Sequence, residues 1–160
     1  YRFDWDEHPV TADASLADLL GAGHGFEIAF VFDYWNLGPL GQRSFTPHNQ
    51  LGRQRLSAAM MAYWAQFART GNPGTGGGQW PQWQPWDGSE LNQAAFMVFD
   101  TQQDGGIRMH QGVHTTQEIL AFIQRQAAFA NKSMRCRAFD SVVARLGDLL
   151  TNTPLHGECL

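Results

Sequence analysis

Charged residues are scarce in this chain of 160 residues, and lysine is almost absent. Only 16 % of the residues are charged, against about a quarter in an average globular domain, and Lys132 is the single lysine. The net charge is −4, and no cluster of basic residues occurs. Nucleic acid and anionic membrane surfaces attract the opposite balance of charge, so we expect neither as a partner.

Long hydrophobic runs are missing as well. No apolar stretch approaches the roughly 20 residues that cross a bilayer, so we predict no membrane span. The chain is nevertheless 43 % hydrophobic and 12 % aromatic, which is enough for a core and is unlike a disordered tail. The sequence leaves the location of the protein open.

Cysteine is limited to Cys136 and Cys159. One disulfide between them would close a loop over the last predicted helix, and two free thiols are the alternative. Histidine is better represented, with 6 residues, of which His110 and His114 have the spacing of a shared metal site on a helix. The intervening Gly112 and Val113 favour strand or loop, and no third ligand follows from the spacing, so we predict exposed polar histidines and no metal.

The clearest periodic segment predicts a helix over residues 50–70, ended by Gly71 and Pro73. The apolar side chains that recur on one of its faces are Leu56, Met60, Tyr63, Trp64 and Phe67. We expect this face to pack into the core. The other patterns predict strands over 1–5, 94–100 and 107–110, helices over 115–130 and 137–150, and an irregular segment over 39–47.

One histidine stands between glycines, in the segment Gly-Ala-Gly-His-Gly-Phe-Glu-Ile-Ala-Phe-Val-Phe over residues 21–32. Flanking glycines let the backbone turn tightly and leave the imidazole of His24 free to approach another group. From these residues alone, a structural loop histidine packed beside the glycines is the simpler interpretation.

The segment resembles the histidine loop of the type-B carboxylesterase/lipase family, which includes the cholinesterases. The positions that match the family pattern are His24, Gly25, Glu27, Ile28, Phe30, Val31 and Phe32. Further segments resemble the family in the same order, at residues 64–73 (Trp-x-x-Phe-Ala-x-x-Gly-Asn-Pro), 80–83 (Trp-Pro-x-aromatic), 96–100 and 135–139. The resemblance implies an α/β class, with this chain as the C-terminal portion of an α/β-hydrolase fold: the last core strand, the histidine loop and the terminal helices.

The nucleophile of such a fold is missing from the chain. In α/β-hydrolases the triad runs serine, acid, histidine along the sequence, and the serine lies in Gly-x-Ser-x-Gly, which does not occur here. The resemblance therefore implies that residues 1–160 are the C-terminal part of a single domain, with the serine, the acid and the oxyanion hole on a companion polypeptide. A strand at residue 1 without a neighbour is seldom stable, so we expect the chain not to fold alone. The family's counterpart of Cys136 is often paired upstream, which would link the two polypeptides.

Within the resemblance, His24 is the catalytic base. A serine hydroxyl is a poor nucleophile at neutral pH, and imidazole can accept its proton and return it to the leaving alkoxide. A carboxylate on the second ring nitrogen would fix the tautomer. The family's acid comes from an earlier loop, so we expect Glu27 to support the histidine loop by hydrogen bonding or as a charge at a helix start.

The function implied is a carboxylic ester hydrolase that acts on a small-molecule ester through an acyl-enzyme, without a cofactor. The main alternative is a cholinesterase-like adhesion protein, which keeps the fold and can keep the histidine but lacks activity. An independent small structural domain is the second alternative. A serine elbow upstream would favour the enzyme, and a replaced serine would favour the binding protein. Many family members are exported, so a secreted or periplasmic location would fit.

Overall fold

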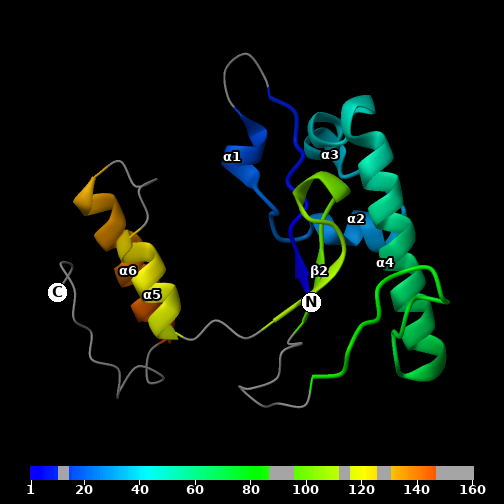
Figure 1. The fold of residues 1–160 in the computed structure, drawn as a ribbon. Helices are drawn as coiled ribbons and strands as arrows, with labels where there is room; N and C mark the ends of the chain where they lie inside the picture. Colours follow the sequence, from blue (N-terminus) through cyan, green and yellow to red (C-terminus); the bar gives the residue numbers. More distant parts are fainter. Residues whose placement is uncertain (11–14, 87–95, 112–115, 126–130, 147–160) are drawn as a thin grey trace. The chain divides into compact units, whose positions relative to one another are not determined.

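The computed structural model describes residues 1–10, 15–86, 96–111, 116–125 and 131–146, and it divides the chain into two compact units (Figure 1). The first unit, Tyr1–Gly112, contains β1 (Arg2–Phe3), α1 (Leu16–Leu20), α2 (Phe26–Phe32), α3 (Gly38–Ser44), the 3-10 helix η1 (Pro47–Asn49), α4 (Gln50–Thr70), β2 (Phe96–Phe99), the 3-10 helix η2 (Gln102–Asp104) and β3 (Arg108–His110). The second unit, Val113–Leu160, contains α5 (Thr116–Arg125) and α6 (Lys132–Leu146). No helix among the described residues is both long and apolar enough to cross a membrane.

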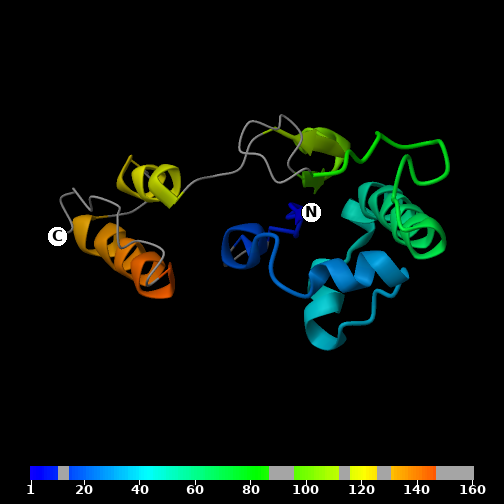
Figure 2. The same cartoon turned by 90° about the horizontal axis from the view of Figure 1, so that it is seen from below.

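The three predicted strands form one sheet in the order β1-β2-β3. β1 runs parallel to β2, with Arg2 opposite Val98, and β2 runs antiparallel to β3, with Met97 opposite Met109. Parallel strands need a long crossover, and the connection from β1 to β2 carries α1 to α4. Helix α4 lies beside the sheet (Figure 2), and the ring of its buried Tyr63 meets that of Phe99 in β2 at 5.6 Å.

The core of the first unit is dominated by aromatic rings. Trp5 and Phe30 are both 0 % exposed, and their ring centroids lie 5.1 Å apart. Phe26 and Phe45 complete the cluster. The ring centroid of Phe26 lies 6.4 Å from that of Trp5 at a tilted angle and 5.9 Å from that of Phe45 in an edge-to-face arrangement. Such geometries are the favourable ones for aromatic pairs. The cluster joins the residues that follow β1 to α2 and to the segment before α4.

Helix α4 spans Gln50–Thr70, as predicted, and Gly71 ends it in the left-handed conformation. The fully buried members of the predicted face are Leu56, Met60 and Tyr63. Trp64 is half-buried and meets the ring of Phe99 at 5.7 Å. Phe67 is 57 % exposed, so the prediction is wrong for this residue. It lies three positions after Trp64, almost one helical turn further along α4, and lines a surface pocket beside Trp83.

The prediction of an irregular segment over 39–47 is also wrong, because α3 begins at Gly38. Pro39 occupies the start of this helix, where its missing N–H leaves no hydrogen bond unmade. Gly41 lies inside it because the backbone passes close to a neighbour: a Cβ there would be 2.8 Å from the carbonyl oxygen of Trp35. The proline and the glycine suggested irregular structure. In the fold, the proline begins a helix and the glycine allows two backbone segments to approach closely.

The second unit is a pair of helices with a small core of its own. The buried residues of this core are Leu120, Ile123 and Phe139. Helix α6 begins at Lys132, earlier than predicted, because the side chain of Asn131 accepts a hydrogen bond from the backbone N–H of Met134 at 3.0 Å and so caps it. Cys136 is disulfide-bonded, whereas Cys159 and the predicted end of the helix near residue 150 lie outside the described residues.

We predict that Ser57→Ala destabilises the fold by about 1–3 kcal/mol. The hydroxyl of Ser57, which is 1 % exposed, donates to the backbone carbonyl of Phe30 at 2.7 Å. That carbonyl lies near the end of α2, where helical carbonyls lack partners within the helix, so alanine leaves it buried and unsatisfied. Urea unfolding of the protein that contains this chain measures the loss.

The control for this measurement is Ser44→Ala. Ser44 is 0 % exposed, but its hydroxyl makes no hydrogen bond among the described residues, so its removal is expected to change stability by less than about 0.5 kcal/mol. Equal losses at the two serines would contradict the role of the Ser57 hydrogen bond.

Candidate active site

His24 lies in an exposed turn directly before α2. The turn, residues 21–25, is called the histidine loop below. Gly25 has φ +91°, a conformation that side chains of L-residues rarely adopt, and a Cβ on Gly23 would lie 3.1 Å from the carbonyl oxygen of Leu20. The predicted need for glycine on both sides of His24 is therefore confirmed. Among the described residues nothing hydrogen-bonds to the imidazole of His24, and the residue is exposed.

Glu27 supports the histidine loop from its C-terminal end, as predicted. One carboxylate oxygen of Glu27 accepts a hydrogen bond from the backbone N–H of Gly25 at 2.8 Å. Gly25 is the N-cap of α2, where backbone N–H groups lack partners within the helix and where negative charge is favourable. The carboxylate of Glu27 is thus engaged with the backbone next to His24.

His8 contacts the same loop from its N-terminal end, which sequence reasoning missed. Its Nε2 lies 3.0 Å from the carbonyl oxygen of Gly21, and its ring meets those of Trp5 and Phe26 at 4.7 and 4.9 Å. His8 is only 5 % exposed, and burial lowers the pKa of its imidazole. No local pattern distinguishes this histidine in the sequence, because its partners are brought to it by the fold.

The other predicted histidines are separate from this loop. His110 lies in β3, as the strand-favouring residues after it indicated, and it is half-buried with its ring stacked on Phe96 at 4.7 Å. The predicted exposed position is therefore wrong for His110, because β2 brings Phe96 beside it. His114 lies outside the described residues.

Three carboxylates gather where β1 and β2 end. Oxygens of Glu7, Asp100 and Asp104 lie within 4.8 Å of one another, close enough to hold a single cation. The hydroxyl of Thr101 donates to the carboxylate of Glu7. Parallel strands end at the same edge of a sheet, so the residues that follow them meet although they are far apart in sequence. This cluster was not predicted from the sequence.

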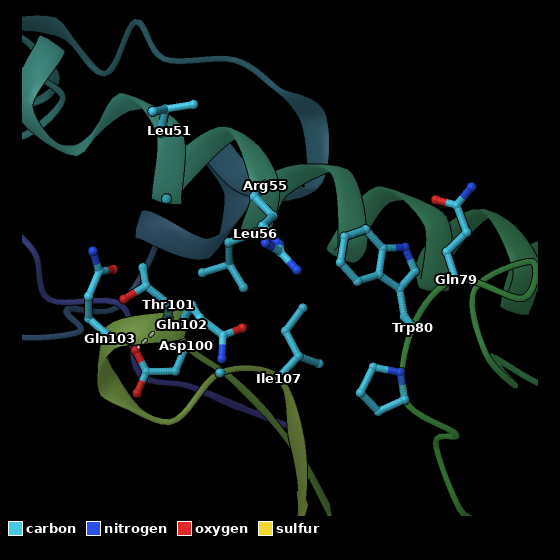
Figure 3. A pocket seen from close by; sticks show the side chains of 13 residues that line it. Leu51, Arg55, Leu56, Gln79, Trp80, Asp100, Thr101, Gln102, Gln103 and Ile107 are labelled. Atoms are coloured by element: carbon cyan, nitrogen blue, oxygen red, sulfur yellow. Dashed lines mark hydrogen bonds between the residues drawn. The ribbon is translucent and has the colours of Figure 1, made fainter.

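Burial dominates the electrostatics of this acidic cluster. Burial, the largest cause, and the neighbouring carboxylates together raise the pKa of Asp100 to about 6, although its carboxylate accepts a hydrogen bond from the N–H of Thr101 at 2.8 Å. The pKa of Glu7 is also raised by burial. A cavity of about 520 Å³ lies beside Asp100, between the first turns of α4 at Arg55 and the loop at Trp80 (Figure 3).

We predict that Asp100→Asn stabilises the protein at pH 7.5 but not at pH 4. The folded state binds the proton of Asp100 more tightly than the unfolded chain, where the pKa is near 3.8. The free energy of unfolding therefore falls as pH rises from about 4 to about 6 and stays lower above that range. Asparagine keeps the shape without the charge, so we expect a gain of about 1–3 kcal/mol at pH 7.5 in urea unfolding.

The control for this pH dependence is Asp140→Asn, at an exposed position in α6. This variant is expected to behave like the wild type at both pH values. If Asp100→Asn shifted stability equally at pH 4 and pH 7.5, the proposed electrostatic cost would be refuted.

Comparison with known proteins gives the relatives of the chain. The carboxylesterase family model matches residues 1–120. Acetylcholinesterase of Electrophorus electricus is 49 % identical over 57 residues, which are 35 % of this chain and 8 % of that protein. Acetylcholinesterase of Danio rerio is 33 % identical over 100 residues, or 61 % of this chain and 14 % of that protein. Carboxylesterase 4A of Bos taurus is 45 % identical over 56 residues, which are 35 % of this chain and 9 % of that protein.

These matches cover only a small part of each relative, between 8 and 14 % of its length. No solved structure matches the chain significantly. The family model nevertheless covers most of the chain, including β1, the histidine loop, α4 and the remaining strands. The chain belongs to the carboxylesterase family.

Proposed function

We propose that this chain supplies the catalytic histidine of a carboxylic ester hydrolase, and that this residue is His24. The observation that carries the proposal is the histidine loop itself. Its imidazole is exposed and without a hydrogen-bond partner among the described residues, while Gly21 and Gly25 on either side are each held by a side chain. A base that must meet a nucleophile from elsewhere needs this combination of a free ring and a fixed backbone.

The chemistry proposed for His24 has two halves. In the first, His24 accepts the proton of a serine hydroxyl as the serine attacks the ester carbonyl, and then returns it to the departing alcohol, which leaves an acyl-serine. In the second, His24 accepts a proton from water, the water oxygen bonds to the acyl carbon, and the proton returns to the serine as the acid departs. A carboxylate on the second ring nitrogen stabilises the imidazolium in both halves. The reaction needs no cofactor.

The remaining parts of this machinery lie outside the 160 residues in our proposal. The sequence contains no Gly-x-Ser-x-Gly, so the serine, the triad acid and the oxyanion hole belong to a companion polypeptide or to an upstream part of the same one. In this arrangement the chain is the C-terminal portion of an α/β-hydrolase domain. Family membership supports this architecture, and the parallel pairing of β1 and β2 is compatible with it.

The experiment is a pre-steady-state assay of the complete protein with a short-chain aryl ester. Mass spectrometry first identifies the polypeptide that accompanies residues 1–160 and its serine motif. The proposal expects a Gly-x-Ser-x-Gly motif, steady turnover and a burst of aryl alcohol equal to the concentration of sites, because an acyl-enzyme accumulates. A replaced serine together with no turnover would refute the proposal and favour the adhesion protein.

A further inference from the structure

We propose that His8 is a positioning residue for His24, fixing the N-terminal end of the histidine loop and so the place where the catalytic imidazole stands. The inference rests on the proposed role of His24. Its starting point is that the loop is held from two sides, by His8 at Gly21 and by Glu27 at Gly25. His24 lies between these two contacts.

The hydrogen bond of His8 defines which of its ring nitrogens carries a hydrogen. The partner of Nε2 is a backbone carbonyl, which can only accept, so Nε2 carries the hydrogen and donates to Gly21 over 3.0 Å. Gly21 has φ +51° and ψ −150° and ends α1, with its own N–H bonded to the carbonyl of Ala17 at 2.8 Å. The peptide that leads from Gly21 into the loop is therefore fixed on its carbonyl side by His8.

His8 also reaches the far end of the loop. Its ring lies edge-to-face with that of Phe26, the first residue of α2, at 4.9 Å. One buried imidazole thus touches the residue that opens the histidine loop and the residue that follows it. We therefore expect a change in His8 to alter the position of Gly21 relative to Phe26. A residue that contacted only one of the two would not have this effect.

The segment that carries His8 is itself fixed to the rest of the first unit. The backbone carbonyl of Glu7 accepts a hydrogen bond from the side-chain amide of Asn49 at 2.8 Å, and the same amide donates to the carbonyl of Ser44, also at 2.8 Å. The carboxylate of Glu7 accepts from Thr101, which follows β2. These contacts fix the position of His8 relative to the end of the sheet and the start of α4. Through His8 they also fix the position of the histidine loop.

His8 is suited to holding the backbone and not to exchanging protons. It is 5 % exposed, and its Nδ1 is buried with no hydrogen-bond partner among the described residues. A proton on Nδ1 would be an unpaired buried donor, which disfavours the cationic form. The neutral ring, with its single donor directed at Gly21, is the form that fixes the loop.

The test compares three variants of the complete protein in the aryl ester assay and in amide hydrogen exchange. His8→Phe keeps a ring between Trp5 and Phe26 but removes the donor, His8→Gln keeps a donor near the place of Nε2, and His48→Phe changes an exposed histidine of η1 as the control. Misplacing a catalytic group by about 1 Å costs up to about a hundredfold, so His8→Phe is expected to lower kcat by about 10- to 100-fold with KM nearly unchanged.

Hydrogen exchange supplies the second readout. In His8→Phe the hydrogen-bonded amides of Gly21, Gly25 and Phe26 are expected to exchange at least about tenfold faster, because the loop opens more often. His8→Gln is expected to recover most of kcat and of the protection, and His48→Phe to leave both unchanged.

Unchanged kcat in His8→Phe would overturn the inference, whether KM rises, exchange becomes faster or neither changes. If the wild type shows no ester hydrolysis at all, the proposed function fails separately. Exchange then decides whether His8 fixes the loop: faster exchange in His8→Phe supports that part, and unchanged exchange refutes it.

Discussion

Replacing His24 by alanine in the complete protein is expected to reduce the hydrolysis of a short-chain aryl ester by several powers of ten. Without the imidazole, the serine hydroxyl has no base to accept its proton, and the departing alkoxide has no acid. The fold should persist, because His24 is exposed and the neighbouring glycines define the turn. The measurement is kcat/KM for wild type and variant, with circular dichroism to show that the fold is kept.

Two other histidines serve as controls for His24→Ala. His48 is exposed in η1, and His110 is half-buried in β3, so neither is a part of the histidine loop. His48→Ala and His110→Ala are expected to retain activity within about threefold, as changes remote from a transition state do. Near-normal turnover in His24→Ala would end the esterase proposal for this residue and favour the adhesion protein.

Phe30→Ala is expected to cost about 3–5 kcal/mol of folding free energy, the largest loss of stability that we predict for a single residue. Phe30 is 0 % exposed, and its ring lies 4.9 Å from that of Phe3 and 5.1 Å from those of Trp5 and Trp35. Alanine leaves a cavity that these rigid rings cannot fill without leaving their own contacts. Urea unfolding of the complete protein gives the loss directly.

Phe32→Ala is the matched control for this loss. Phe32 lies two positions later in the same helix and is 71 % exposed in this structure. Because alanine is the better helix former, a small effect there would assign the loss at Phe30 to packing and not to helix propensity. A loss below about 1 kcal/mol at Phe30 would contradict the aromatic core described above.

The sequence predicted the features that depend on local pattern. The limits of α4 followed from helical spacing and from Gly71, and the exposed His24 followed from the glycines around it. The loop-supporting role of Glu27 followed from its place near a helix start. In each of these cases the decisive neighbours are within a few residues, so a short window contains the physical cause.

The missed features depend on contacts between distant residues. His8 becomes important only because folding places Gly21 and Phe26 around it, and Asp100 only because the ends of two parallel strands meet. The exposure of Phe67 likewise depends on where the packing surface under α4 ends. These partners lie from 13 to more than 90 positions away in the sequence, so a short window does not contain them.

The parallel pairing of β1 with β2 has a consequence for biosynthesis. Residue 2 pairs with residue 98, so the pairing of β1 with β2 must wait until about 100 further residues have been made. At roughly 5–20 residues per second, that delay is on the order of 5–20 s. The contact between His8 and Gly21 is local and can form early, whereas the bond between Glu7 and Thr101 must wait. In this interval the apolar residue of β1 lacks its partner strand, and exposed apolar surface of this kind is what chaperones bind.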